Sequence, residues 1–588
     1  MHTTTRALAF FGLLACTRPD TQPAWRETPG TYCNPLDLDY AYIPSRHTYY
    51  GRNESHRSTA DPVVVNYRDT LLLFSTNQQG YWWSADMARW HFVRHDFRIN
   101  RSNDNVCAPG AWAWGDTLLF MPSHMDRDRM PLYVSTDPVR GIWTELVDSF
   151  PQAHAWDPSL FKDDDGSAYL YWGSSNFYPL YGVALDPGRR YTPTGPVAEL
   201  VHMKPDEHGW ERFGENHSDT TIAAYSEGLW MTKHAGRYYL QYAAPGTEWN
   251  VYADGVYVGD HPLGPFTYAA HNPFSSKSGG FITGAGHGST FADPWGNYWH
   301  IATGLNWIRY KFERRLVLFP AGFDAGGLLY AETAFGDYPH YLPTGRRDHR
   351  QSHFTGWMLL SYRKPATASS SLPDKDPARA FDENIRSYWS AASADSGEYL
   401  AVDLGSVCTL HAFQVNYADE DVHIYDKQPD IYHQYRVWHS RDGQDWQVLV
   451  DKNQNRTDEP HDYVELVRPV QTRYLRLENV HMAAGKFAVA GWRLFGLSGD
   501  GAPAPVRDLS VERHADTREA TLRWRPSAGA YAYQIRYGIA PDKLYTAVMV
   551  YGDTTYALRG LNRDAAYYGH VEALGEGGVA AGGAATPF

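Results

Sequence analysis

The sequence predicts an all-β chain of several domains that begins with a five-bladed β-propeller. Apolar residues alternate over runs of about four to eight positions between Gly, Asp and Asn turns, which is strand periodicity. Aromatic residues make up 15% of the chain, and such side chains are typical of sheets. One turn-and-strand pattern also recurs five times along the first part of the sequence. At 588 residues the chain is too long for a single hydrophobic core, which indicates about three or four domains.

The first 30 residues resemble an export signal followed by a tether. Arg6 precedes the apolar run from Ala7 to Ala15, which is too short to span a bilayer. The run is followed by Cys16 and resembles a bacterial lipobox, in which the cysteine is lipidated. We therefore expect a lipoprotein-type signal peptide over residues 1–16 and a tether over 17–30. The protein would be secreted across the inner membrane and anchored at the outer membrane by lipid alone; an ordinary secretory signal with a chance cysteine is the alternative.

Charge and cysteine content narrow the classes of partner and site. The chain carries 53 Lys and Arg against 67 Asp and Glu, a net charge of −14, which repels phosphate backbones. Nucleic acid is therefore not an expected partner. Beyond Cys16 the cysteines have no zinc-ligand spacing. Cys33 and Cys107 could form a disulfide or stay buried thiols, and the sequence leaves both alternatives open.

The propeller prediction depends on a hairpin repeated between residues 31 and 345. Five turns lie beside an aromatic-rich strand, at Asp69, Asp116, Gly166, Gly236 and Gly296. The steps between these turns are 47, 50, 70 and 60 residues, enough for about four short strands each. A β-sandwich would not explain the repeat.

Residues at the same distance before these turns are expected to meet, because the first strand of every blade lines the central channel. Counting back eight or nine positions gives Asp61, Ala108 or Cys107, Asp157, Glu227 and His287. Three carboxylates and one imidazole from four blades should therefore face one another. Any one of them alone would be unremarkable, so the shared register carries the argument for a functional site.

Converging carboxylates without a phosphate-binding loop favour acid–base cleavage of a glycosidic bond. Inverting hydrolysis needs one carboxylic acid to protonate the leaving oxygen and one carboxylate to activate water, about 6.5–9.5 Å apart. A third carboxylate near the acid raises the pKa of that acid through like charge. Three acids match this requirement.

The motifs around these residues resemble glycoside hydrolase family 43. They are Ala60-Asp61-Pro62-Val63, Trp156-Asp157-Pro158, Ser226-Glu227-Gly228 and Gly286-His287-Gly288-Ser289. The resemblance spans residues 31–345 and implies a five-bladed propeller whose enzymes invert configuration. It implies Asp61 as general base, Asp157 as pKa modulator and orienter, and Glu227 as general acid. His287 would then support the site by contacting a structural calcium in the channel, or the waters of that calcium.

Four further side chains of the propeller are candidates for sugar contacts. Trp82, Trp83 and Trp249 could stack on a sugar ring, and packing between blades is the alternative for each of them. Arg309 could bind sugar hydroxyls, with an ion pair at the rim as the alternative.

Two appended domains follow a polar connector. Residues 355–497 resemble a discoidin-type β-sandwich, the fold of carbohydrate-binding module family 32, in motifs such as Ala380-Phe381-Asp382-Glu383-Asn384 and Tyr474-Leu475-Arg476-Leu477. That family often holds a structural calcium where Asp382 lies. Residues 503–588 resemble a fibronectin type III β-sandwich in the stretch from Tyr533 to Tyr537, and we expect this domain to act as a spacer.

The leading functional prediction is an inverting, exo-acting glycoside hydrolase that acts on plant polysaccharides or oligosaccharides. It would release α-L-arabinofuranosyl or β-D-xylosyl units, with galactosyl units left open, and would need no cofactor for catalysis. One alternative is a retaining fructan hydrolase on a related propeller, whose usual Arg-Asp-Pro and Glu-Cys motifs are replaced here by Trp156-Asp157-Pro158 and Glu227-Gly228. The other is a non-catalytic surface glycan-binding protein, against which the intact carboxylates argue.

Overall fold

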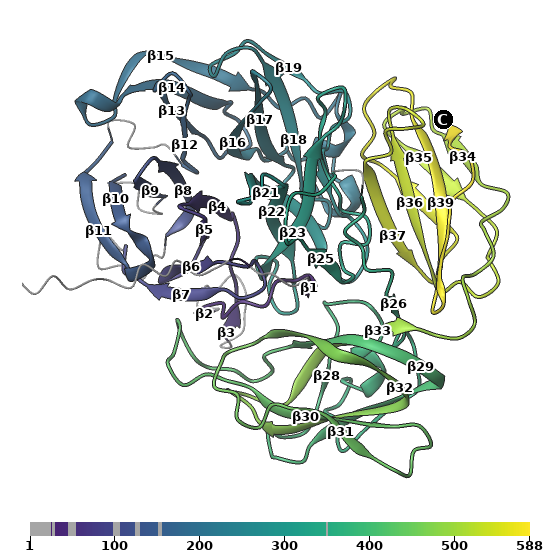
Figure 1. Ribbon diagram of the computed structural model, residues 1–588. Helices are drawn as coiled ribbons and strands as arrows, with labels where there is room; N and C mark the ends of the chain where they lie inside the picture. The colour runs from purple at the N-terminus through teal and green to yellow at the C-terminus, as the bar shows by residue number, and fades with distance from the viewer. Residues whose placement is uncertain are drawn as a thin grey trace, which may run out of the picture.

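Figure 1 shows the computed structural model, a chain built almost wholly of strands. The structure describes residues 25, 30–44, 55–97, 106–123, 130–150, 156–348 and 351–588. The predicted signal peptide with Cys16 lies outside these residues, as does the predicted tether apart from Trp25 and Gly30. Within the described part of the chain, no helix is long and apolar enough to cross a membrane.

Five four-stranded antiparallel blades form the propeller, which confirms the predicted fold class. Strands pair in chain order within each blade, and the first strand is innermost. The first three blades contain β4 (Val63–Tyr67), β5 (Thr70–Phe74), β6 (Gly80–Ser84) and β7 (His91–Arg94); β8 (Cys107–Trp114), β9 (Thr117–Ser123), β10 (Leu132–Asp137) and β11 (Ile142–Val147); and β12 (Ser159–Lys162), β13 (Ala168–Trp172), β14 (Leu180–Asp186) and β15 (Thr192–Val201). The last two contain β16 (Glu227–His234), β17 (Arg237–Ala244), β18 (Ala253–Gly259) and β19 (Phe266–Tyr268); and β21 (Thr283–Ala292), β22 (Tyr298–Leu305), β23 (Arg314–Phe323) and β24 (Leu329–Ala331).

The five inner strands close a ring around the channel. β4 contacts β8, β8 contacts β12, β12 contacts β16, β16 contacts β21, and β21 returns to β4. The segment before the first blade adds to this closure, because β1 (Gly30–Tyr32) pairs with β25 (His340–Leu342) and the Asn34 side chain donates to the Leu318 carbonyl of the fifth blade (2.8 Å). Residues at one register of different blades therefore become neighbours.

Aromatic side chains fill the spaces between blades. Between the first and second blades, the ring centroids of Phe74 and Phe120 lie 4.8 Å apart, and Phe74 stacks on Tyr81. Trp112 of the second blade and Trp230 of the fourth, which are not adjacent blades, also lie 5.9 Å apart. Much of the high aromatic content of the sequence thus serves packing between blades, where large rings bury the most apolar surface.

The second domain is a β-sandwich. Its strands pair in the order β26 (Met358–Leu359), β33 (Ala488–Leu497), β29 (Tyr399–Tyr417), β32 (His461–His481), β30 (Gln434–Ser440) and β31 (Gln447–Asp451), with β27 (Ala366–Ala368) on β29 and β28 (Trp389–Ser390) on β33. The long β29–β32 ladder shifts register between Asp403 and Cys408, and such irregularities bend a strand from one layer to the next. The layers enclose a core that includes Trp389, Phe413 and Trp492.

The third domain is a smaller β-sandwich of two sheets. One sheet has the order β34 (Ser510–Arg513), β35 (Ala520–Arg523), β38 (Thr555–Leu558), and the other has β37 (Thr546–Tyr551), β36 (Ala532–Gly538), β39 (Tyr568–Gly575), β40 (Gly578–Ala580), with β41 (Thr586–Pro587) on β39. Trp524 and Tyr533 pack between the sheets. In Figure 1 this domain lies beside the propeller and the second domain lies below both.

Buried ion pairs join the second domain to the propeller. Arg57 at the end of β3 (Ser55–Arg57) is fully buried and pairs with Asp419 (3.3 Å) and with Asp458. Arg493 of the second domain pairs with Glu383 (2.9 Å) and donates to the carbonyl of Asp337 in the propeller (2.5 Å). Charged groups therefore fix the two domains to one another.

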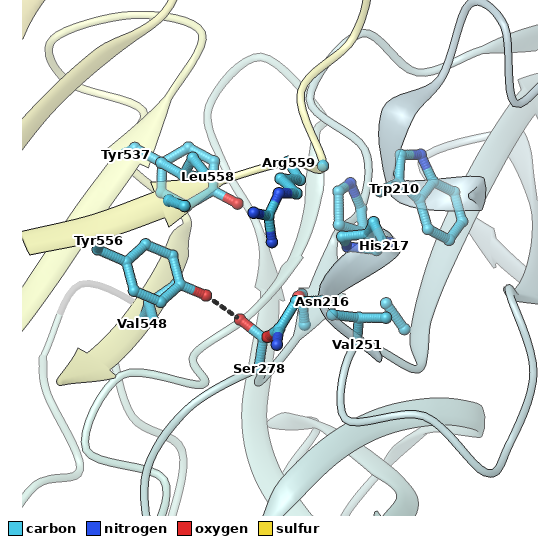
Figure 2. Close-up of a pocket in the computed structure, with 15 residues that line it drawn as sticks. Trp210, Asn216, His217, Val251, Ser278, Tyr537, Val548, Tyr556, Leu558 and Arg559 are labelled. Carbon is cyan, nitrogen blue, oxygen red and sulfur yellow. Dashed lines mark hydrogen bonds between the residues drawn. The ribbon is translucent and has the colours of Figure 1, made fainter. Parts of the chain in front are cut away.

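The third domain packs against the connection between the third and fourth blades, and its role as a spacer stays a prediction. Arg212 pairs with Glu519 (3.0 Å), and the amide of Gly209 donates to the Leu561 carbonyl (3.0 Å). Figure 2 shows the cavity at this interface, where the hydroxyls of Tyr556 and Ser278 lie 3.2 Å apart. Its volume of about 20 Å³ suffices for about one water molecule.

The disulfide alternative for Cys33 and Cys107 is not realised in the described residues. Cys33 is buried beside the propeller edge, and its Sγ lies 3.2 Å from the carbonyl oxygen of Asp337. Burial raises the pKa of this thiol to about 12. Cys33 therefore stays protonated and acts as a core residue.

Candidate active site

One unusual backbone turn recurs at corresponding positions of the five inner strands. Asp61, Ala108, Asp157 and His287 have φ values of 54°, 29°, 52° and 46°, and Gly228 of the fourth blade has 69°. Left-handed backbone is uncommon for residues that carry a Cβ, and such strain clusters at functional sites. The register that the sequence spacing predicts is thus present in the backbone of all five blades.

Asp61 lies two residues before β4 and points toward the fifth blade. Its amide donates to the Thr303 hydroxyl (2.8 Å), and the Thr76 hydroxyl donates to its Oδ2 (2.6 Å). Its Oδ1 lies 3.2 Å from Nδ1 of His287 and 3.9 Å from the Arg314 guanidinium. Only 7% of Asp61 is exposed, so protein groups rather than bulk water hold this carboxylate in place.

Glu227 begins β16 and is 9% exposed. Tyr252 donates to its Oε1 (2.5 Å) and Ser174 donates to its Oε2 (3.3 Å). Burial raises the pKa of Glu227 above its ordinary value; the charge of His287 opposes this rise and the Asp61 carboxylate adds to it. A carboxyl group that keeps its proton closer to neutral pH is suited to general acid catalysis.

Asp157 lies before β12 and is 6% exposed. Burial raises its pKa well above the usual range, and the Glu227 and Asp61 carboxylates add to the rise against the opposing charge of His287. Its Oδ2 has no hydrogen-bond partner among the described residues. Carboxyl groups this close titrate as a group that shares protons, so Asp157 helps to keep a proton within the cluster.

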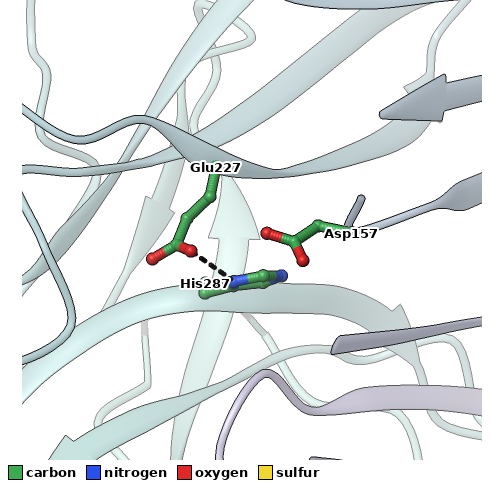
Figure 3. A group of neighbouring side chains, drawn as sticks. All are labelled: Asp157, Glu227 and His287. Atoms are coloured by element: carbon green, nitrogen blue, oxygen red, sulfur yellow. Dashed lines mark ion pairs between the residues drawn. The ribbon is translucent and has the colours of Figure 1, made fainter. Parts of the chain in front are cut away.

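His287 lies at the centre of these carboxyl groups, and Figure 3 shows Asp157 and Glu227 turned toward its ring. Its Nδ1 lies 3.9 Å from Oε2 of Glu227. Burial lowers the pKa of His287, but the Asp61, Asp157 and Glu227 carboxylates outweigh burial and raise it above the ordinary value. The surrounding carboxylates therefore favour the protonated imidazole, whose charge balances part of theirs.

The position of His287 is set by two neighbours. The Asp254 carboxylate accepts hydrogen bonds from the amides of His287 (2.8 Å) and Gly288 (2.9 Å). The backbone of Gly228 lies against the imidazole, where a Cβ would come within 2.7 Å of the ring. A side chain at Gly228 would displace the imidazole, because real Cβ atoms do not approach ring atoms so closely.

The spacing between Asp61 and Glu227 bears on the mechanism. Nδ1 of His287 is 3.2 Å from Oδ1 of Asp61 and 3.9 Å from Oε2 of Glu227, so these two oxygens are at most about 7 Å apart. Inverting glycosidases place their two carboxyl groups about 6.5–9.5 Å apart and retaining ones about 5–5.5 Å apart. This upper bound admits both geometries, so the stereochemistry of the product is the deciding measurement.

Two of the four side chains predicted to contact a sugar are not placed to do so. Trp82 has no exposed surface, and its indole donates to Asp39 (2.6 Å) within the core of the first blade. Arg309 has a side chain that is 2% exposed and pairs with Glu420 of the second domain (2.9 Å). The ring of Trp82 therefore cannot reach a sugar, and Arg309 serves the domain interface.

The other two tryptophans lie in different surroundings. Trp83 is on β6, the third strand of its blade, and stacks on His91 at 4.4 Å, which places it away from the strand that lines the channel. Trp249 is half-buried beside Phe213 (5.3 Å). Its neighbour Thr247 accepts a hydrogen bond from Arg314 (3.0 Å), the residue that approaches Asp61. Trp249 thus remains a candidate for a sugar contact.

Sequence reasoning missed the side chains that orient the acids. Thr76 and Ser174 each stand two residues beyond the second strand of a blade, after β5 and β13, and they donate to Asp61 and Glu227. In a hairpin, the end of the second strand lies beside the start of the first. Counting forward from each turn to the end of the second strand could therefore have identified these hydroxyls. Tyr252 lies before a third strand and carries no such signal.

The donor set around His287 does not fit a directly bound calcium. Ligand atoms of Asp157, Glu227 and His287 lie within 4.8 Å of one another, but calcium takes about six to eight oxygen ligands. Asp382 lies outside both groups of convergent ligands found in the described residues. Its oxygens accept hydrogen bonds from the amide of Asn384 and the hydroxyl of Ser387.

The second convergent group consists of Asp37, Glu459 and Asp462. The Lys452 ammonium donates to Glu459 (2.8 Å) and to Asp462 (2.6 Å). A lysine therefore already takes the position of a cation there.

Comparisons with known proteins agree with this geometry. Residues 55–329 match the family described as Glycosyl hydrolases family 43, and residues 365–492 match the F5/8 type C domain. Residues 55–329, most of the propeller, are thus similar to glycoside hydrolase family 43. This matched region, the family 43 domain below, contains Asp61, Asp157, Glu227 and His287, and the second domain matches the discoidin type that the sequence predicts.

Curated relatives of the family 43 domain are distant. A protein named β-xylosidase from Xylanibacter ruminicola is 27% identical over 164 residues, which are 24% of this chain and 45% of that protein. A xylosidase/arabinosidase from Bacteroides ovatus is 26% identical over 184 residues, 28% of this chain and 54% of that protein. The chain thus spans about half the length of the curated relatives it matches. A solved structure named glycoside hydrolase is 20% identical, with a TM-score of 0.43, over 74% of this chain and 97% of that one.

Proposed function

We propose that the family 43 domain is an inverting, exo-acting glycoside hydrolase that releases α-L-arabinofuranosyl or β-D-xylosyl units from plant-type polysaccharides or oligosaccharides. The convergence of three buried carboxyl groups on His287, with the pKa of Glu227 raised by burial, carries this proposal. The relatives named β-xylosidase and xylosidase/arabinosidase support the class of sugar. Galactosyl substrates belong to the same proposal as a third class to be tested.

In the proposed mechanism Glu227 protonates the glycosidic oxygen as the bond to the leaving sugar breaks. Asp61 accepts a proton from a water molecule, which attacks the anomeric carbon from the opposite face. The hydroxyls of Tyr252 and Ser174 hold the Glu227 carboxyl in one orientation. Asp157 shares a proton with the acid, because its pKa is also raised well above the usual range, and the positive charge of a protonated His287 limits the total negative charge of the cluster.

We infer supporting roles for the other parts of the chain. The discoidin-type domain would attach the enzyme to a glycan and raise the local concentration of substrate. The third domain would be a fibronectin type III domain, which its resemblance and its two-sheet sandwich support. The lipobox-like sequence supports export and lipid anchoring at the outer membrane.

A structural calcium remains a proposal that needs its own test. Any calcium in the channel would reach His287 through water, and one in the second domain would add ligands beyond Asp382. We expect chelation with EDTA to leave kcat unchanged, because no chemical step uses a metal. A fall in melting temperature on chelation, reversed by calcium, would support a structural ion.

A panel of aryl glycosides that differ only in the sugar tests the proposed activity. We expect turnover of the 4-nitrophenyl α-L-arabinofuranoside or β-D-xyloside, with the Asp61→Asn and Glu227→Gln variants as catalytic controls. A β-D-galactoside and a galactofuranoside test the third class. No turnover of any member, with intact binding of an oligosaccharide, would favour a glycan-binding protein instead.

A further inference from the structure

Two exposed aromatic side chains stand close to the proposed acid. Phe177 is 84% exposed and Tyr178 is 69% exposed, in the loop between β13 and β14. Ser174, three residues before Phe177, donates to Glu227. Three residues of extended chain span at most about 11 Å, so the backbone of Phe177 cannot lie farther than that from Ser174.

Hydrogen bonds fix this loop to the backbone that carries the catalytic groups. The amide of Gly173 donates to the Trp156 carbonyl, one residue before Asp157 (2.8 Å). Ser175 and Ser226 exchange two backbone hydrogen bonds of 3.0 Å, one residue before Glu227. The position of the loop is therefore coupled directly to that of two site residues.

The tip of the loop is held as firmly as its base. The Ser175 hydroxyl accepts hydrogen bonds from the amides of Phe177 (2.9 Å) and Tyr178 (3.1 Å). The Asn176 side chain donates to the carbonyl of Ala223 on the neighbouring loop (2.6 Å). A loop ordered in this way loses little conformational freedom when a ligand binds, yet the two rings it presents are largely open to solvent.

We propose that Phe177 and Tyr178 form a platform that binds the sugar units on the leaving-group side of the scissile bond. This inference deepens the proposed function and rests on it. The acid protonates the leaving oxygen, so the leaving chain must extend from Glu227, the residue to which this loop is joined. Aromatic rings with exposed faces stack on the apolar faces of sugar rings, and the Tyr178 hydroxyl can bind a sugar hydroxyl at the platform edge.

A polymer or oligomer is the occupant that these positions favour. A short aryl leaving group would end near Glu227, whereas a chain of several sugars would continue over the loop. The platform would therefore select for longer leaving groups without contacting the sugar that is released. It would make the enzyme more efficient on chains than on small glycosides.

The Phe177→Ala, Tyr178→Ala double variant tests the platform, with Val467→Ala of the second domain as the matched control for an exposed apolar side chain. The substrates are an aryl glycoside and a tetrasaccharide that carry the same terminal sugar. We expect the double variant to lose about tenfold more kcat/KM on the tetrasaccharide than on the aryl glycoside. The loss should arise mainly through KM, because binding is weakened equally before and in the transition state.

Other outcomes overturn the proposal in distinguishable ways. Equal effects on the two substrates, or none on either, would exclude a leaving-group platform. A change in self-association by sedimentation, with unchanged tetrasaccharide kinetics, would instead identify a protein docking surface. If the wild-type protein turned over neither substrate, the proposed function would fail. Calorimetric titration with the tetrasaccharide would then test the platform by itself. Weaker binding by the double variant would then support the platform, and equal binding would overturn it.

Discussion

Replacing Glu227 with glutamine removes the proposed acid and preserves most of its surroundings. The amide oxygen of the new side chain can still accept the hydrogen bond that Tyr252 donates to Oε1. The new amide nitrogen faces the hydroxyl of Ser174, which can accept a hydrogen bond in place of donating one. We therefore expect Glu227→Gln to fold with an unchanged melting temperature. A loss of turnover can then be assigned to the chemical step.

The size of the loss depends on the leaving group. General acid catalysis contributes about 10²–10⁴-fold, which is about 2.7–5.4 kcal/mol of transition-state stabilisation. Glu227 is 9% exposed, so bulk water cannot readily replace its proton, and an oligosaccharide should suffer a loss within that range. In a 2,4-dinitrophenyl glycoside, the dinitrophenolate leaves as a stable anion without protonation. The kcat/KM for this substrate should therefore fall less than about tenfold.

The assay compares kcat/KM for these two substrates in the wild type, in Glu227→Gln and in Glu199→Gln. Glu199 is an exposed residue of the third blade and controls for the substitution itself. Equal losses on both substrates in Glu227→Gln would contradict the role of Glu227 as general acid. Loss of the circular dichroism spectrum of a folded β protein would instead assign to Glu227 a structural role.

Three further predictions concern the base, the imidazole and the domain interface. Asp61→Asn should lose turnover that added azide partly restores, since azide needs no deprotonation; no rescue at any azide concentration would argue against a base. His287→Gln removes a charge that lowers the pKa of Glu227, so the basic limb of the kcat/KM profile should move to higher pH, and an unmoved limb would refute that coupling. Arg57→Ala leaves Asp419 and Asp458 buried without their cation, which should cost about 3–5 kcal/mol of stability in chemical denaturation. The exposed control Arg525→Ala should cause no measurable change.

The sequence was sufficient to predict that four candidate site residues lie close together. Asp61, Asp157, Glu227 and His287 share a register before four of the five hairpin turns, and a propeller converts equal register into proximity. Left-handed φ values occur at Asp61, Asp157 and His287, and in the fourth blade at Gly228, the residue after Glu227. The predicted convergence is confirmed because, in a repeated fold, residues at the same distance before the turn of each repeat lie close together in space.

Contacts that depend on side-chain direction or on another domain could not be predicted in this way. Trp82 and Trp83 are adjacent on β6, and alternation places them on opposite faces of the blade, but neither face is the channel. Arg309 lies in the propeller sequence, yet its partner Glu420 follows it by 111 residues. Nothing in the spacing of either residue indicates a domain interface. The calcium expected at His287 was carried over from the family resemblance and stays a prediction.

The anomeric configuration of the first product is the most direct test of the central claim. A substrate of defined configuration is mixed with wild-type enzyme in an NMR tube, and the anomeric proton signals are followed before mutarotation. Asp61 acting as a base on water, with Glu227 as acid, predicts that the released sugar first appears with inverted configuration. First appearance of the retained anomer would make Asp61 a nucleophile and would contradict the mechanism.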